Sequence, residues 1–327
     1  MAAAPRIFEK VYSRVVSSAQ AAGGAKAKIF DWAFTVGVDV VRRRQAGRPV
    51  RPWQNVQLAV ADRLVFARIR ARLGGNLEYL VSGSAALSPQ IAEWFAAAGL
   101  PILEGYGLTE TSGASFVNHP DDVHIGTVGR ALSGTEVRIA DDGEILLRGP
   151  GVMRGFHNLP DETARVIDGD GWLATGDVGE VDAGGFLRIT DRKKDLVKTS
   201  GGKYIAPTAI ESAIKAACPI VSHAVLIAEG RRFASLLVTL DPDAHTTESA
   251  EAAVERAIKS VNAVLNRWET VKQFRILPRE LSIEAGELTP SMKIRRAVVA
   301  RNHADVIDGI YSGRPDDPDR QAPRRAE

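Results

Sequence analysis

Residues 104–111 read Glu104-Gly105-Tyr106-Gly107-Leu108-Thr109-Glu110-Thr111. Two glycines flank an aromatic side chain that can stack on a flat base, and a hydroxyl and a carboxylate follow directly. Thr109 could bond a phosphate, and Glu110 could hold Mg²⁺, a hard cation that prefers oxygen ligands. The pattern is equally compatible with an ordinary glycine-rich loop capped by a threonine. The surrounding sequence therefore decides whether this segment predicts a nucleotide site.

The sequence on both sides of this segment predicts strands and helices in a definite order. Residues 77–81 read as a buried strand, and residues 88–98 as a helix with Pro89 in its first turn. Asp141-Asp142-Gly143 is a hairpin signal. Further short strands are expected at residues 101–103, 135–140, 144–148 and 186–190. Strand, helix, strand and then hairpins predict an α/β layer joined to a β-rich subdomain.

The first 73 residues are predicted to be helical. Apolar residues recur at roughly helical spacing from Pro5 to about Ala46. Gly23-Gly24 separates two helices in this stretch, and a third helix is expected from about Val56 to Leu73. Arg42-Arg43-Arg44 fits a solvated helix end better than a phosphate-binding patch, because cations favour the C-terminal end of the helix dipole.

A second unit is expected after the charged cluster at residues 191–195, which we interpret as an interdomain linker. Its helices are predicted near residues 207–217, 248–266 and 292–311, and its strands near residues 220–228, 233–240 and 274–277. The Pro, Asp and Arg content of residues 312–327 is typical of a disordered tail. The predicted parts are residues 1–190, the linker 191–195, a domain at 196–311 and the tail 312–327.

Composition narrows the class of protein. The chain has 327 residues, of which 45% are hydrophobic and 25% are charged, as in a globular protein with a sizeable core. Its net charge of +2 predicts no nucleic-acid partner. Cys218, the single cysteine, fits a reducing cytoplasm and reads as a buried structural thiol. Met1–Lys10 lacks the apolar core of a secretory signal peptide. The sequence contains no run of 18 apolar residues, so it predicts no transmembrane segment and leaves only peripheral membrane contact open.

Two further segments suit nucleotide chemistry. The small residues in Ser82-Gly83-Ser84-Ala85-Ala86-Leu87 let a ring or a phosphate approach the backbone, although a tight strand-to-helix turn alone would explain them. Asp177 closes Gly171-Trp172-Leu173-Ala174-Thr175-Gly176-Asp177, and its carboxylate could accept both hydroxyls of a ribose. A turn aspartate is the commonest alternative.

Two basic segments also stand out. Residues 191–203 combine dense charge with Gly201-Gly202, but Tyr204 stands where a P-loop needs Ser or Thr. Taken alone, such a run is typical of a solvated face. Lys293 lies just inside a predicted helix start, where most lysines are surface residues. A functional one would neutralise phosphate charge, an effect of about 4 kcal/mol at about 4 Å and an effective dielectric constant of about 20.

The order and spacing of these segments resemble the adenylate-forming superfamily of acyl-CoA synthetases, luciferases and peptide-synthetase adenylation domains. Bacterial long-chain fatty-acid–CoA ligases look most similar. The resemblance covers nearly everything from Pro5 to Tyr311 and is strongest at residues 5–12, 104–111, 191–207 and 288–296. It implies a truncated large domain, with an α/β layer and a β-rich subdomain, followed by a small mobile C-terminal α+β domain.

The resemblance assigns one group of residues to ATP or AMP. The adenine pocket is implied to be formed by Gly83, Ser84, Ala85, Gly105, Tyr106 and Gly107. The ribose hydroxyls are implied to be held by Asp177 and Arg192. Thr109 would contact phosphate, and Glu110 would bind Mg²⁺.

A second group is implied to act in domain movement and acyl transfer. Lys194 matches the hinge about which the C-terminal domain turns, and Lys293 matches the lysine that assists adenylation. Lys293, Glu110 and Thr109 are thus the implied catalytic residues. Gly201 and Gly202 fall where the family admits the pantetheine arm of coenzyme A. Asp191 stands where many relatives have Gly, which is a mild departure.

The implied reaction joins a fatty acid to coenzyme A through an acyl-AMP, with ATP, Mg²⁺ and CoA as participants. Family members are nearly twice as long, and nothing here matches their Ser/Thr/Gly-rich loop that grips the ATP triphosphate. The sequence therefore predicts a truncated gene, a misassigned start, or a half-protein that pairs with another chain or with itself. The competing functions are a ligase completed by the missing half, an inactive nucleotide-binding remnant, and an acyl-AMP ligase without CoA transfer.

Overall fold

The computed structural model describes residues 1–242, 244, 249–290 and 292–312. The N-terminal part is helical, as predicted, with α1 (Pro5–Ala21) and α2 (Gly24–Gln45) separated at Gly23. The predicted third helix is confirmed in position but starts earlier and is interrupted. It consists of α3 (Pro52–Ala61), one π-helical turn (Asp62–Phe66) and α4 (Ala67–Arg72). No helix among these residues is both long and apolar enough to cross a bilayer.

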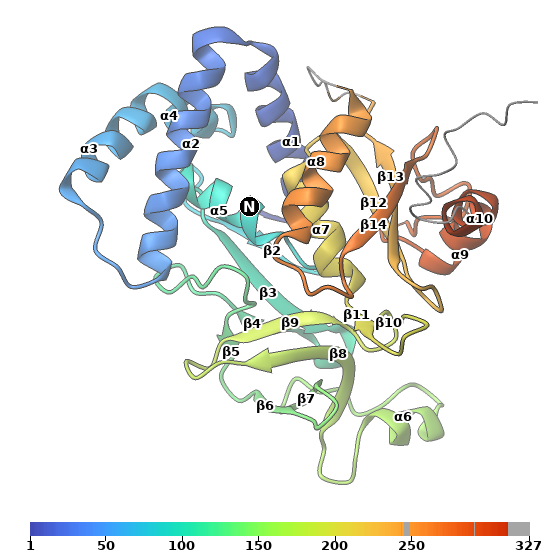
Figure 1. The fold of residues 1–327 in the computed structure, drawn as a ribbon. Helices are drawn as coiled ribbons and strands as arrows, with labels where there is room; N and C mark the ends of the chain where they lie inside the picture. Colours follow the sequence, from blue (N-terminus) through green and yellow to red (C-terminus); the bar gives the residue numbers. More distant parts are fainter. Residues whose placement is uncertain (243, 245–248, 291, 313–327) are drawn as a thin grey trace, which may run out of the picture.

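A five-stranded sheet forms beside these helices (Figure 1). Its strands are β1 (Ala2–Ala3), β2 (Leu80–Ser82), β3 (Ile102–Leu108), β4 (Gly113–Val117) and β5 (Arg130–Ala131). The first three pair in parallel, and β3, β4 and β5 pair antiparallel. Between β2 and β3 runs α5 (Pro89–Ala97), with Pro89 at its first turn as predicted. Its buried Trp94 stacks on Phe34 of α2, so this helix joins the sheet to the helical layer.

A separate four-stranded antiparallel sheet is the predicted β-rich subdomain, at the bottom of Figure 1. Its strands are β6 (Glu136–Ile139), β7 (Glu144–Arg148), β8 (Leu173–Val181) and β9 (Leu187–Arg192), and α6 (Pro160–Val166) lies between β7 and β8. The predicted hairpin at residues 141–143 joins β6 to β7, with Gly143 at φ 85°. The long strand β8 was not predicted, because its glycines mask the strand pattern.

The C-terminal part begins after β9 and has its own hydrophobic cores. It contains the β10 (Val197–Lys198) and β11 (Tyr204–Ile205) pair, and the sheet of β12 (Val221–Ile227), β13 (Ala234–Leu240) and β14 (Val271–Ile276). Its helices are α7 (Pro207–Ala217), α8 (Ala250–Asn262), α9 (Arg296–Asn302) and α10 (Ala304–Ser312). The last helix was predicted as one from residue 292 and is instead two, starting at Arg296. Cys218 is buried, as predicted. Most of the predicted tail, residues 313–327, lies outside the described residues.

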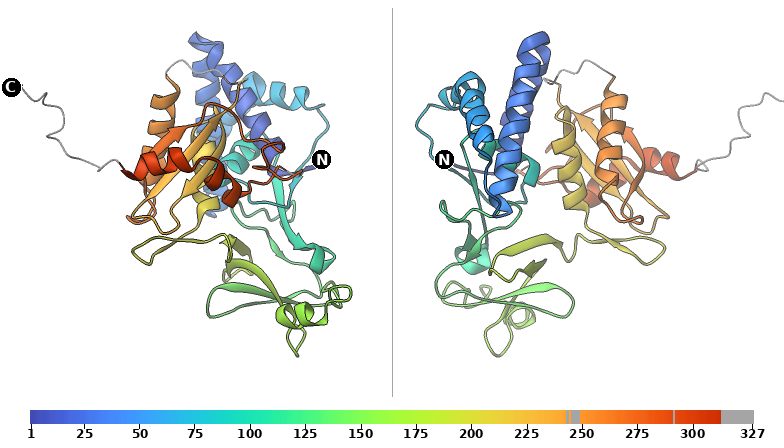
Figure 2. Two further views of the ribbon diagram at one scale, coloured as in Figure 1. Left: turned by 90° about the vertical axis from the view of Figure 1, so that its right-hand side faces the viewer. Right: turned by 60° about the vertical axis from the view of Figure 1, so that its left-hand side comes forward.

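The C-terminal part contacts α1 through side-chain hydrogen bonds and an ion pair. Figure 2 shows the whole chain from two further sides. Arg6 donates to the Ser222 carbonyl at 2.6 Å and to its hydroxyl at 2.8 Å. Lys215 forms a 2.6 Å ion pair with Glu9, and the Tyr12 hydroxyl donates to the Ala216 carbonyl at 3.1 Å. These contacts hold the C-terminal sheet against the helical layer.

Candidate functional site

Three residues from two different sheets meet at the candidate nucleotide site. Tyr106 lies on β3, and its buried hydroxyl donates a 2.7 Å hydrogen bond to Asp177 Oδ2 on β8. Asp177 pairs with Arg192 of β9 in the sheet register, and Arg192 Nε lies 3.1 Å from Asp177 Oδ1. The predicted convergence of these three residues is therefore present. Asp177 lies within β8, next to a register shift at Val178 and Gly179, so the alternative of a turn aspartate does not apply.

The environment of this cluster keeps Tyr106 a hydrogen-bond donor. Burial raises its pKa well above the ordinary value, and the nearby Asp177 carboxylate raises it further. The phenol therefore stays protonated at neutral pH. Each carboxylate oxygen accepts more than one hydrogen bond, so Asp177 can bind Tyr106 and Arg192 and still accept from a ligand. Arg192 is 46% exposed and presents its guanidinium to solvent.

The loop after β2 lies beside Tyr106. Ser82 pairs with Glu104 in the parallel register, which sets Gly83 next to Gly105. A Cβ added at Gly83 would lie 3.5 Å from the Gly105 carbonyl oxygen, so the two backbones run close together. Ser84 has φ 69°, and Ser84 and Ala85 are exposed. The loop thus offers an open backbone surface near the buried tyrosine, which suits the approach of a flat ring.

Gly107 has a structural explanation. A Cβ at this position would lie 1.8 Å from the Gly113 carbonyl oxygen on β4, a distance no side chain tolerates. The close approach of β4 therefore requires glycine here, with or without a nucleotide. Gly105 is less restricted, because a Cβ added there would lie 3.3 Å from the Phe116 carbonyl oxygen.

Thr109 and Glu110 lie in a 3₁₀ turn that follows β3 directly. Thr109 is exposed, and the Glu110 carbonyl accepts a 2.8 Å hydrogen bond from Met153 N. Within residues 1–242, 244, 249–290 and 292–312, no group of three or more His, Cys, Asp and Glu side chains could hold a metal. One carboxylate fits Mg²⁺ nonetheless, because this ion usually takes one or two protein carboxylates together with substrate phosphates.

Side-chain contacts anchor the start of the linker segment, whereas the predicted site residues further along it are exposed. Lys193 Nζ lies 2.6 Å from Asp142 and 2.8 Å from Glu144, which ties it to the β6–β7 hairpin. Asp191 accepts hydrogen bonds from the Thr208 amide and hydroxyl, so this buried residue caps the start of α7. Lys194 is exposed in the turn after β9. Gly201 and Gly202 lie in the exposed turn between β10 and β11, where Gly202 has φ 77°.

Lys293 is exposed and precedes α9, so its expected placement inside a helix start is wrong. In the part of the chain that the structure describes, its ammonium has no hydrogen bond or ion pair, and none connects it to Tyr106 or Asp177. Its segment is anchored by Glu287, whose fully enclosed carboxylate accepts from Arg279 at 2.7 and 2.9 Å. Hydrogen bonds from Arg279 hold the pKa of Glu287 at about 2, so this anchor is ionised at neutral pH.

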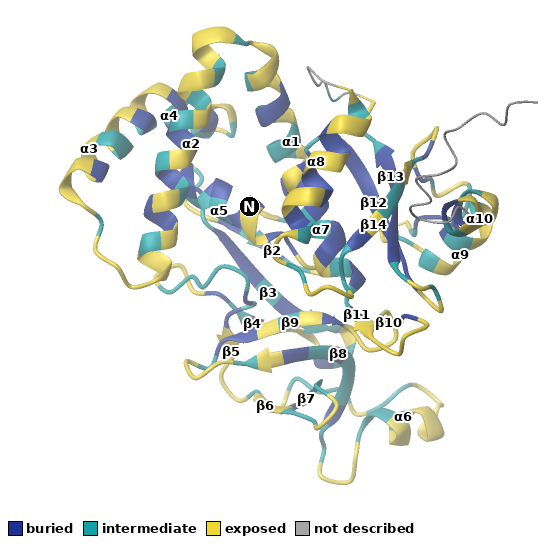
Figure 3. Cartoon of the chain, viewed as in Figure 1, coloured by how far each residue is buried: buried dark blue, intermediate teal, exposed yellow. Residues whose placement is uncertain are grey.

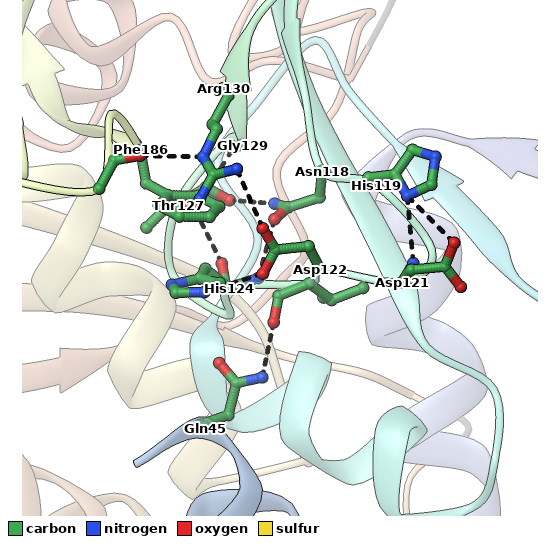
Figure 4. Close-up of polar contacts among 12 residues, drawn as sticks. Gln45, Asn118, His119, Asp121, Asp122, His124, Thr127, Gly129, Arg130 and Phe186 are labelled. Atoms are coloured by element: carbon green, nitrogen blue, oxygen red, sulfur yellow. Dashed lines mark hydrogen bonds and ion pairs between the residues drawn. The ribbon is translucent and has the colours of Figure 1, made fainter. Parts of the chain in front are cut away.

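Glu104, two residues before Tyr106 on β3, has a buried carboxyl group to which the sequence patterns assigned no role. Glu104 is only 8% exposed, and burial raises its pKa to about 7, against hydrogen bonds from the Leu87 and Gly126 amides that lower it. The loop that supplies Gly126 is fixed by the network in Figure 4. In it, Asn118 binds the Thr127 carbonyl at 2.7 Å, and Asp122 pairs with Arg130 at 3.2 Å.

Replacing Glu104 by glutamine should stabilise the protein above pH about 7 and have little effect below pH about 4.5. The carboxyl group loses its proton near pH 4.5 in the unfolded chain and near pH 7 in the folded protein. The parent protein therefore loses stability as the pH rises between these two values, whereas the uncharged glutamine variant does not. The gain should approach about 3 kcal/mol. Urea unfolding of both proteins across this range measures it, and an equal difference at every pH would contradict it.

Comparison with known proteins identifies the family of the chain. Residues 1–157 match the family model "AMP-binding enzyme", and residues 194–315 match "AMP-binding enzyme C-terminal domain". The fold and these two matches together show that the chain belongs to the adenylate-forming family of AMP-binding enzymes.

Among curated proteins, the chain is similar to long-chain-fatty-acid–CoA ligases. It is 39% identical to FadD15 of Mycobacterium tuberculosis, over 94% of this chain and 54% of the relative. It is 33% identical to the human ligase ACSBG1, over 94% of this chain and 48% of the relative. The chain thus spans about half the length of the curated relatives it matches.

Solved structures show the same fold. The adenylation domain of a carboxylate reductase from Mycobacterium chelonae aligns with 95% of this chain and 46% of its own, with a TM-score of 0.73 and 22% identity. ATP-bound MatB from Rhodopseudomonas palustris aligns with 72% of this chain and 47% of its own, with a TM-score of 0.57 and 29% identity. The predicted fold class, an adenylate-forming large domain with a small C-terminal α+β part, is confirmed.

Proposed function

We propose that this chain provides the adenosine-holding residues and the C-terminal lysine of an AMP-forming ligase, which activates a long-chain fatty acid as acyl-AMP and transfers it to coenzyme A. The observation that carries the proposal is the buried Asp177 carboxylate, which joins Tyr106 to Arg192 across two sheets. The similarity to long-chain-fatty-acid–CoA ligases over 94% of the chain supports the choice of substrates.

Each residue of the cluster has a defined task in this proposal. Asp177 accepts the ribose hydroxyls while Arg192 holds its carboxylate in place. Tyr106 packs on the base beside the loop of Gly83, Ser84 and Ala85. Thr109, exposed at the end of β3, donates to a phosphate oxygen, and Glu110 binds Mg²⁺ that accompanies the phosphates. Gly105 leaves room for the base next to β3.

The chemistry takes place in two steps. A fatty carboxylate oxygen attacks the α-phosphorus of ATP, the bond to the β-phosphate breaks, and pyrophosphate leaves. Lys293 neutralises the charge that develops on the phosphate and carboxylate oxygens. The thiolate of CoA then attacks the acyl carbon, and AMP leaves with the bonding electrons. The exposed glycines Gly201 and Gly202 leave a surface along which the pantetheine arm can pass.

Domain movement connects the two steps. Lys293 and the Gly201–Gly202 turn lie on the same C-terminal part, so one rotation can remove the lysine and present the glycines. Lys193 anchors the linker to the large domain, which makes the exposed Lys194 the natural pivot. We assign residues 1–190 to the large domain, 191–195 to the hinge and 196–311 to the mobile domain.

The triphosphate needs a contribution from elsewhere, because no segment of this sequence matches the family's phosphate-gripping loop. We propose that a polypeptide corresponding to the N-terminal half of the long relatives provides it. Two other functions compete: a nucleotide-binding module that holds AMP without catalysis, and an acyl-AMP ligase that does not use CoA.

We expect the chain alone to bind AMP, and to catalyse pyrophosphate exchange with ATP and a long-chain fatty acid only when mixed with the N-terminal half of a long relative. Lys293→Ala should reduce exchange by about 100-fold or more and leave AMP affinity unchanged, because the lysine acts on the phosphate and carboxylate. Isothermal titration with AMP and isotope exchange measure the two properties.

Lys272→Ala is the matched control, since Lys272 is an exposed lysine of the same part of the chain. AMP binding without exchange in the mixture would favour the nucleotide-binding module. Acyl-AMP that accumulates even when CoA is present would favour the ligase that does not use CoA. Failure to bind AMP would overturn the proposal.

A further inference from the structure

The helical segment that begins with α3 has apolar side chains on two opposite faces. One face packs into the core of the large domain through Ala61, Val65, Phe66 and Ile69. The other face is turned to solvent and is formed by Trp53, Val56, Val60 and Leu64, which are 52%, 66%, 45% and 40% exposed. We call these four residues the Trp53 face. In Figure 3, α3 lies at the outer edge of the molecule and is largely exposed.

The spacing of these four residues places them along one side of the helix. Intervals of three, four and four residues repeat close to the helical period, so the side chains lie in a row. Single exposed apolar residues are normal on protein surfaces, whereas a row that includes a tryptophan indicates an interaction surface. The core-facing residues already account for the packing of this segment, so the Trp53 face has no role in the core that the described residues of this chain form.

The charge around the Trp53 face is strongly positive. From Val41 to Asn76 the chain has nine arginines and one acidic residue, Asp62, which pairs with Arg70 at 2.7 Å. Two more of these arginines pair with acidic residues outside this stretch, Arg42 with Glu93 and Arg43 with Asp39. Removing these from the 42 basic and 40 acidic residues of the whole chain leaves 33 and 39. The remainder is therefore net negative, and the near-neutral total conceals a concentrated basic region.

Many of these arginines are free to bind an external partner. Several are exposed and have no hydrogen bond or ion pair from their side chains within the described part of the chain, among them Arg44, Arg48, Arg63, Arg68 and Arg72. Guanidinium groups bind phosphate oxygens with two parallel hydrogen bonds. An apolar row bordered by free arginines is the composition of a helix that lies in the plane of a membrane surface.

We propose that the Trp53 face docks on a bilayer containing acidic phospholipids, with α3 parallel to the surface. The four apolar side chains enter the boundary between headgroups and acyl chains, and the surrounding arginines bind headgroup phosphates. A nucleic acid would satisfy the arginines but would leave Trp53 and Val56 in water. A second copy docked through the same face would bring two arginine clusters together, which repel each other.

This docking does not depend on the ligase reaction. The Trp53 face is formed by α3 and the π-helical turn, whereas Tyr106, Asp177 and Arg192 lie on β3, β8 and β9. Membrane binding can therefore be measured without nucleotide, and its failure is distinguishable from failure of the proposed activity. If both are correct, the enzyme works on the surface into which long-chain fatty acids partition.

Co-sedimentation of the full chain with vesicles tests the proposal. We expect binding to phosphatidylcholine vesicles that contain phosphatidylglycerol, weak binding to phosphatidylcholine alone, and weaker binding as salt is added, because screening acts on exposed charges. Trp53→Ser with Val56→Ser, and separately Arg63→Glu with Arg68→Glu, should each lower the partition coefficient about tenfold or more.

Matched controls distinguish this face from a general surface effect. Val264→Ser removes an apolar side chain that is 85% exposed elsewhere, and Arg301→Glu reverses an exposed arginine on α9. Both should bind vesicles like the parent, and thermal unfolding checks that all variants fold. Equal binding by the parent and both double variants would overturn the proposal. So would a parent that ignores vesicles but forms dimers that Trp53→Ser with Val56→Ser dissociates, since the face would then join copies of the chain.

Discussion

Replacing Asp177 by alanine should weaken AMP binding by about 100-fold or more. The carboxylate is the acceptor we assign to both ribose hydroxyls, and each hydrogen bond to a charged group contributes about 1.5–3 kcal/mol. The substitution also removes the partner of the buried Tyr106 hydroxyl and of the Arg192 guanidinium. Isothermal titration of the full chain with AMP measures the change, and thermal unfolding reports any cost to the fold.

Two further variants make this result specific. Asp177→Asn keeps the shape and one acceptor, so it should retain more affinity than alanine. Glu180→Ala is the matched control, because Glu180 lies on the same strand and forms an exposed ion pair with Arg188 of β9. If Asp177→Ala and Glu180→Ala bound AMP equally well with intact folds, the ribose would have to be held elsewhere.

Replacing Glu211 by alanine should destabilise the C-terminal part by about 3 kcal/mol. Glu211 is buried on α7 and binds Arg296 Nη1 at 2.5 Å and Nη2 at 3.1 Å. It also accepts a 2.6 Å hydrogen bond from the Leu226 amide on β12. Its removal leaves a largely enclosed guanidinium without its hydrogen-bonded carboxylate and a strand amide without an acceptor, which explains the size of the effect.

Hydrogen exchange followed by mass spectrometry localises this effect. Amides of β12 and α9 should exchange faster in Glu211→Ala, whereas those of β3 and β8 should keep the parent rate. Glu255→Ala, an exposed glutamate of α8, should leave all these rates unchanged. Glu211→Leu combined with Arg296→Met should recover part of the stability, since a well-packed apolar pair can replace a buried ion pair. Uniformly faster exchange throughout the chain would contradict a local role.

Local sequence patterns predicted many of the elements well. β7 and α7 have the predicted bounds. Their signals are a short apolar run after the Asp141-Asp142-Gly143 turn for β7 and Pro207 at the first turn for α7, and neither depends on distant parts of the chain. β8 was missed and the last helix was predicted to begin too early. β8 takes its conformation from pairing with β7 and β9. The segment before α9 is held by the bridge between Leu288 and Ile294 and by the Arg295 amide bond to the Glu287 carbonyl, which delay the start of the helix.

The candidate site, too, was predicted from the sequence only in part. Residue types that suit a nucleotide singled out Tyr106 and Asp177, and the family resemblance added Arg192. Glu104 and the loop around Gly126 were not identified, because a buried glutamate in a strand has no sequence signal and its amide partners come from Leu87 and Gly126. Lys293 was recognised, but its position before α9 depends on the Glu287 anchor, which no local pattern reveals.

Short-range chemistry in the sequence was enough to indicate the family and most of the order of helices and strands, and to single out the residues that we propose touch a nucleotide. Those properties follow from spacing, turn residues and side-chain types, which act over a few residues. Folding in three dimensions decided that Tyr106 donates to Asp177, that Gly107 must lack a side chain, and that Trp53 faces solvent among free arginines. These depend on which strands pair and which helix faces are covered, and both are set by contacts between residues far apart in the chain.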